Sequence, residues 1–154
     1  MVNIPGFLSA WQIVDNCVSK PAEKTSIAMT IFLSEWEKEF GPSEEVRKNL
    51  NEIMIEWSGD EKGGTGFSED GHPVENATFS GLTLIKTMIW VKEDSNSPLI
   101  CETSLAHELT HASIWALKGT DGDPDHLGTK YYGWSIRHSL VIQRTNQRLC
   151  RLGI

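Results

Sequence analysis

The chain has 154 residues, of which 39% are hydrophobic and 23% charged, a balance typical of one globular domain. Its 21 acidic and 14 basic side chains give a net charge of -7, which disfavours a broad phosphate-binding surface and gives no strong nucleic-acid signal. No apolar run approaches the roughly 18 residues that a membrane span needs, and the N-terminus lacks the basic segment of a signal peptide. The cytoplasm is slightly favoured, and a secreted form with a trimmed signal stays open.

The three cysteines, Cys17, Cys101 and Cys150, lie far apart and form no CxxC pair. An odd number of unclustered cysteines argues against both a disulfide framework and a cysteine zinc site. We expect buried free thiols in a reducing compartment. One disulfide with one free thiol is the alternative.

The first half of the chain predicts two helices and a strand. Residues 20–41 repeat apolar side chains at helical spacing between Pro21 and a Gly-Pro stop. A short helix follows, opened by Ser43. Residues 51–59 alternate apolar and polar side chains, which predicts a strand with one buried face. The inward side chains expected are Ala28, Ile31, Phe32 and Trp36 in the helix, and Ile53, Ile55 and Trp57 in the strand.

The second half predicts a loop or loose hairpin over residues 59–73, then two strands or one bent strand on either side of Gly81. A helix follows from Leu99 or Thr103 to Lys118, and a last helix covers residues 129–149. Strands grouped between helices predict a two-layer α+β fold in a single domain, residues 1–154. In it a small mixed or antiparallel sheet packs on the helix that carries the sequence HELTH, with N- and C-terminal helices flanking it.

The HELTH sequence, residues 107–111, has the spacing of a catalytic metal site. Residues four apart on a helix point the same way, so His107 and His111 can both bind one Zn²⁺ ion. Glu108 is rotated by about 100° from His107, where it can accept a proton from a metal-bound water. Catalytic zinc usually has three protein ligands, and His126, after a gap of 14 residues, can supply the third.

This pattern resembles the zincin metallopeptidases, and the distant His126 followed by LGTKYYGW resembles their SprT-like branch. The resemblance implies a minimal zincin-like fold and a zinc metalloendopeptidase. His107, His111 and His126 would be its zinc ligands and Glu108 its general base. SprT-like proteases that act on DNA-crosslinked proteins generally carry a zinc ribbon or basic DNA-binding regions. This acidic chain has neither, so a role in DNA repair does not follow.

Two further roles belong to the peptidase interpretation. Tyr132, or its neighbour Tyr131, would donate a hydrogen bond to the oxyanion of the transition state. The segment Leu84–Val91 would be an edge strand that binds an extended peptide by strand addition. Each has a structural alternative, namely core packing for the tyrosines and an internal strand for the segment.

Other interpretations stay open at this stage. Asp125 can replace His126 as the third ligand. Alternatively, Asp125 or Asp121 can orient the imidazole of a ligand histidine. The simpler explanation of both aspartates is an acidic turn in solvent. His72 and His138 are expected to be surface or packing residues. The main alternative function is a non-catalytic zinc-stabilised binding or regulatory module. The other is a metal-free interaction domain in which HExxH is accidental.

Overall fold

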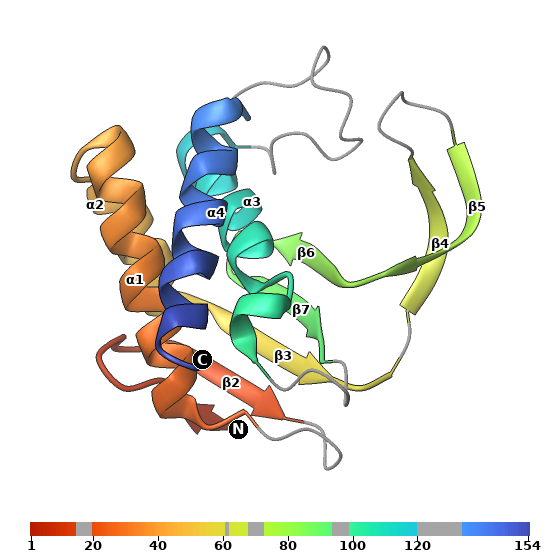
Figure 1. Ribbon diagram of the computed structural model, residues 1–154, viewed down its shortest axis with the longest axis horizontal. Helices are drawn as coiled ribbons and strands as arrows, with labels where there is room; N and C mark the ends of the chain where they lie inside the picture. The colour runs from red at the N-terminus through yellow and green to blue at the C-terminus, as the bar shows by residue number, and fades with distance from the viewer. Residues whose placement is uncertain (15–19, 61, 68–72, 94–98, 120–133) are drawn as a thin grey trace.

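The computed structural model describes residues 1–14, 20–60, 62–67, 73–93, 99–119 and 134–154, with only the backbone described for 62–67 and 73–78. Four α-helices and a mixed five-stranded sheet make up an α+β architecture (Figure 1). The predicted fold class is confirmed.

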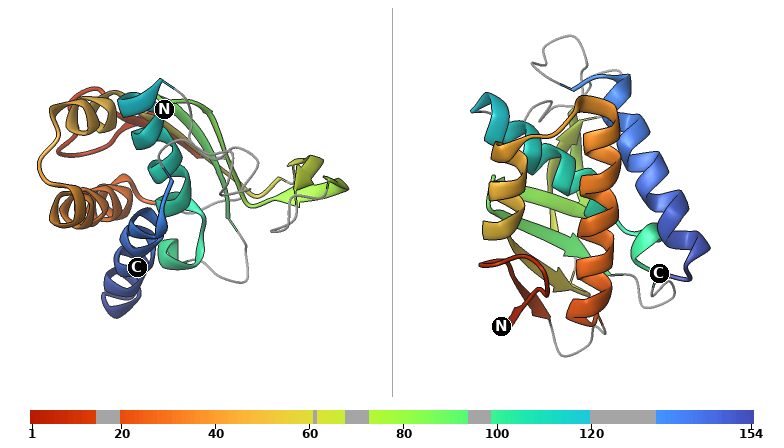
Figure 2. Two further views of the ribbon diagram at one scale, coloured as in Figure 1. Left: turned by 90° about the horizontal axis from the view of Figure 1, so that it is seen from above. Right: turned by 90° about the vertical axis from the view of Figure 1, so that its left-hand side faces the viewer.

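The five-stranded sheet has the strand order β1-β2-β3-β7-β6. Its three central strands, β2, β3 and β7, are parallel, and the outer strands β1 and β6 pair antiparallel with their neighbours. A separate antiparallel pair, β4 and β5, extends away from the body (Figures 1 and 2). The strand bounds are β1 Val2–Asn3, β2 Trp11–Val14, β3 Met54–Ser58, β4 Lys62–Phe67, β5 Pro73–Phe79, β6 Gly81–Ile85 and β7 Met88–Lys92.

The helices gather on one face of this sheet (Figure 2). Both predicted N-terminal helices are confirmed. Helix α1 ends at Gly41, which has a positive φ of 85°, and Ser43 caps α2 by accepting a hydrogen bond from the Val46 N–H. A single 3₁₀ turn, η1, precedes the helix that carries HELTH. The helix bounds are α1 Ala22–Phe40, α2 Glu44–Glu52, η1 Ile100–Glu102, α3 Leu105–Lys118 and α4 Ile136–Arg151.

The core lies between the helices and the inward face of the central strands. Trp90 in β7 is fully buried outside this core, whereas alternate residues of β3 and β7 are fully buried within it. The inward face of α1 covers them with large side chains, so the apolar periodicity of the sequence is confirmed. The residues concerned are Ile55, Trp57, Ile89 and Val91 in the sheet, and Met29, Phe32 and Trp36 in α1.

Two short strands and the start of the last helix differ from the prediction. Strands β1 and β2 were not expected, because each is very short and β2 pairs with a strand that lies two helices away in the sequence. The last helix begins at Ile136, because the Ser135 side chain caps it by accepting from the Arg137 N–H. The proposed start of that helix, residues 129–133, lies outside the described residues.

The prediction that Leu84–Val91 forms one edge strand is wrong. The chain turns at Lys86 and Thr87, and the Asn49 side-chain amide holds that turn by donating to the Lys86 carbonyl at 2.7 Å. Strand β7 is internal, between β3 and β6, so Leu84 and Ile85 are the only residues of the segment in the edge strand. The edge strand next to β7 is β6.

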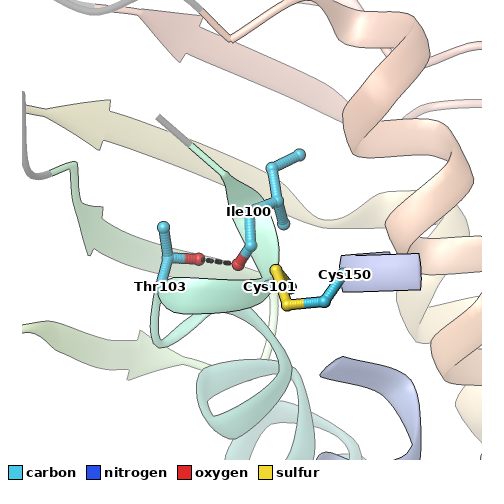
Figure 3. The surroundings of a disulfide bond; sticks show 4 residues. All are labelled: Ile100, Cys101, Thr103 and Cys150. Atoms are coloured by element: carbon cyan, nitrogen blue, oxygen red, sulfur yellow. Dashed lines mark hydrogen bonds between the residues drawn. A yellow bond between two sulfur atoms is a disulfide. The ribbon is translucent and has the colours of Figure 1, made fainter. Parts of the chain in front are cut away.

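The expectation of free thiols is also wrong for two of the three cysteines. Cys101 in η1 and Cys150 in the last turn of α4 form a disulfide (Figure 3). The Thr103 hydroxyl steadies the turn by donating to the Ile100 carbonyl, and the Cys101 N–H donates to the carbonyl of Ile154. The bond therefore ties the entry to α3 to the end of α4. Cys17 lies outside the described residues.

Arginines on α4 pair with carboxylates of α1. Arg137 and Arg144 both donate to Glu39, at 2.8 and 3.2 Å, and Arg148 donates to Glu35 at 3.0 Å. Three of the basic side chains near the C-terminus thus serve the packing of α1 on α4. Within the described part of the chain, no helix has both the length and the apolarity to cross a membrane.

Replacing both Cys101 and Cys150 with Ala should lower the free energy of unfolding by about 2–4 kcal/mol, because the bond closes a loop whose ends are 49 residues apart. Urea denaturation of the variant and the wild type measures the difference. Thiol titration of the unreduced, denatured wild type should find one reactive cysteine. Finding three would show that the disulfide does not form.

Candidate metal site

Helix α3 is buried along most of its length, and of the HELTH residues only His107 is partly exposed. Leu105, Leu109 and Ala112 recur at helical spacing and are buried. Gly119, in the left-handed conformation with φ 79°, ends the helix by donating its N–H to the Trp115 carbonyl. His107 and His111 are therefore one turn apart on a rigid element.

The two histidine rings converge. Their Nε2 atoms are 3.1 Å apart, and the rings meet edge to face with centroids 4.8 Å apart. The His107 side chain is 34% exposed, whereas His111 is buried, so the pair opens toward solvent on the His107 side. Two nitrogen ligands of one tetrahedral Zn²⁺ are about 3.3 Å apart. The observed distance is close to that value, and it equally suits a hydrogen bond between the rings.

Glu108 is buried between α3 and the edge strand β6. The Thr83 hydroxyl lies 3.0 Å from its Oε1 and 3.2 Å from its main-chain oxygen. Its Oε2 lies 4.0 Å from the His107 Nε2. The ligand atoms of His107, Glu108 and His111 all lie within 4.8 Å of one another, so this group could hold a metal ion. The structure thus supports a metal site at HELTH without identifying the metal.

Gly81 makes the close approach of β6 to Glu108 possible. A Cβ at this position would lie 2.8 Å from both the Cγ and the Oε2 of Glu108, closer than real contacts allow. The sequence prediction treated Gly81 only as a break between strands. A lone glycine inside a strand pattern is typical of a close backbone approach, and this was the available signal.

Trp134 covers both histidines. Its ring centroid is 5.2 Å from that of His107 and 4.7 Å from that of His111. Trp134 also stacks on the ring of His138. The ring centroid of His138 lies 4.5 Å from that of Phe40. The predicted last helix, residues 129–149, included Trp134. This residue lies just before α4 instead, and helix periodicity could not reveal its contact with the candidate ligands.

His138 is a packing residue, as expected. It is 8% exposed, and its Nδ1 accepts a hydrogen bond from the Ser135 N–H at 2.9 Å. Burial, reinforced by the neighbouring positive charge of Arg137, lowers the pKa of His138 to about 4. The ring is therefore neutral at pH 7 and stacks on Trp134 without carrying charge.

Several predicted residues lie outside the described part of the chain. They are His126, Asp125, Asp121, Tyr131, Tyr132 and His72. His107, Glu108 and His111 are brought together as the motif predicts, and Leu84 belongs to the strand that passes over Glu108. In comparisons with protein-family models, curated proteins and solved structures, none matches this chain.

The free energy of unfolding should fall as the pH drops from about 6.5 to 4. The pKa of His138 is lower in the folded chain than in the unfolded chain, so the unfolded chain binds a proton first as the pH falls. The free energy of unfolding should decrease by up to about 3 kcal/mol over this range. Urea denaturation between pH 4 and 7.5 measures it.

His138→Gln provides the control, because a glutamine carbonyl can still accept from the Ser135 N–H but does not titrate. Glu39, whose pKa is lowered chiefly by its hydrogen bond with Arg137, stays ionised through most of this range. If the free energy of unfolding of His138→Gln falls with pH as steeply as that of the wild type, the pH dependence does not come from His138.

Proposed function

We propose that the protein is a zinc-dependent metallopeptidase. The observation that carries the proposal is the convergence of the His107 and His111 Nε2 atoms to 3.1 Å beside a buried carboxylate. Imidazole nitrogens are preferred ligands of Zn²⁺, and a catalytic zinc site keeps one position for water. The partly exposed side of His107 supports an accessible position of this kind.

His126 is proposed as the third ligand, because three protein ligands complete a catalytic zinc site. Asp125, its neighbour in the sequence, is the alternative. Trp134 supports the two helical ligands by packing on both rings, which restricts their rotation.

Glu108 is proposed as the general base. Ligands of one tetrahedral ion are about 3.3 Å apart, and the Glu108 Oε2 is 4.0 Å from the His107 Nε2. This longer separation favours a carboxylate beside a metal-bound water over one that binds the metal. When bound, Zn²⁺ lowers the pKa of its water and polarises the carbonyl of the peptide bond. Glu108 would take a proton from the attacking water and later pass it to the leaving amine. Tyr132, or Tyr131, would donate to the oxyanion.

The substrate is proposed to be an extended peptide that lies along β6. Among the described strands, β6 pairs only with β7, so its other edge can accept a further strand. Thr83 and Gly81 of β6 lie against Glu108, so a peptide paired along this strand would lie beside the base.

The test combines metal content with cleavage of a peptide library. Purified wild type should bind about one zinc per chain, and His107→Ala, His111→Ala and His126→Ala should each lose most of it, as measured by elemental analysis. Glu108→Gln should retain zinc and cleave about 10²–10⁴-fold more slowly, since only the base is removed. Asp125→Ala decides whether this carboxylate binds the metal in place of His126.

Glu102→Gln is the matched control, because Glu102 is an exposed glutamate just before α3 and its loss should change neither property. Zinc binding without cleavage of any peptide would favour the non-catalytic zinc-stabilised module. No zinc in the wild type, even after reconstitution, would make HExxH accidental.

A further inference from the structure

The two oxygens of the Glu108 carboxylate have different surroundings. Oε1 accepts a hydrogen bond from the Thr83 hydroxyl at 3.0 Å. Oε2 lies 4.0 Å from the His107 Nε2 and next to the backbone of Gly81. Thr83 thus holds one oxygen, and the other oxygen lies on the side of the histidine pair.

The hydroxyl of Thr83 also reaches the backbone of the helix. It lies 3.2 Å from the main-chain oxygen of Glu108 and shares its single proton between the two acceptors. Both acceptors belong to the same residue, so this one side chain connects the edge strand to both the backbone and the carboxylate of Glu108.

Gly81 restricts the carboxylate from a second direction. The place that a Cβ would take at residue 81 is 2.8 Å from Oε2 and 3.0 Å from Cδ. The strand backbone therefore limits rotation about the last torsion of Glu108, which is otherwise soft. Thr83 and Gly81, two residues apart on β6, point to the same face and define one orientation of the carboxylate.

We infer that Thr83 is a positioning residue, which holds Glu108 so that Oε2 is presented to the metal-bound water. The inference rests on the proposed function. A general base must lie within hydrogen-bond reach of its proton, and misplacement by about 1 Å can cost up to 10²-fold in rate. A freely rotating carboxylate would spend part of its time turned away from the histidines.

The test compares Thr83→Val, which has the same shape without the donor, with Thr83→Ser, which keeps the hydroxyl. Thr83→Val should lower kcat about tenfold or more, with KM and the zinc Kd within about twofold of wild type, because neither substrate nor metal contacts are removed. Thr83→Ser should restore most of the rate. Thr30→Val, the same change at an exposed threonine of α1, is the control.

A second variant tests whether Gly81 restricts the Glu108 carboxylate. Gly81→Ala places a methyl group 2.8 Å from the present position of Oε2, too close for both to stay, and it should give the same loss of kcat at an unchanged zinc Kd. Thermal melts of all variants establish that each is folded. If Thr83→Val does not fold, Gly81→Ala and Thr83→Ser carry the comparison.

Crystal structures of the wild type and Thr83→Val, after incubation of each with zinc, supply a readout independent of cleavage. The Glu108 Oε2 should stay near His107 in the wild type and move away in Thr83→Val. If the wild type cleaves no peptide, the proposed function fails, and the carboxylate position alone decides the positioning role. An unmoved carboxylate in Thr83→Val, or a kcat equal to that of the wild type, would overturn the inference.

Discussion

The close approach of α3 to strand β6 is the constraint on which the candidate site depends. At Gly81 the strand backbone comes so near the helix that only a glycine leaves room for the Glu108 side chain. A carboxylate buried in this way needs hydrogen-bond donors, and Thr83 provides one from the same strand. Beside Glu108, which is held against the sheet, the rings of His107 and His111 converge until their Nε2 atoms are 3.1 Å apart.

The remaining contacts hold the C-terminal part of the chain against this helix. Trp134 packs on both histidines and on His138, whose neutral ring extends the aromatic cluster to Phe40 of α1. The disulfide between η1 and the end of α4 joins the entry of α3 to the far end of the helix that follows Trp134. Disulfides persist mainly in oxidising compartments, so this bond favours such a compartment over the reducing one expected from cysteine spacing.

Sequence alone predicted the features that depend on local periodicity. The apolar spacing of α1, the Ser43 cap of α2, the alternation in β3 and the one-turn separation of His107 and His111 are all visible in short windows. Features set by contacts between distant segments were missed or misplaced. The pairing of β2 with β3, the Cys101–Cys150 bond and the crowding of Gly81 against Glu108 each join residues more than 25 positions apart. A turn at Lys86 likewise divided a segment that appeared to be one strand.

The most direct test of the metal site is a crystal structure of the zinc-loaded protein with diffraction data on both sides of the zinc absorption edge. The account predicts one anomalous peak about 2.0–2.1 Å from the Nε2 atoms of both His107 and His111. The Glu108 carboxylate should lie outside bonding distance of the ion, on the side of a bound water. A peak elsewhere, or no peak in a crystal whose protein retains the 3.1 Å histidine pair, would contradict it.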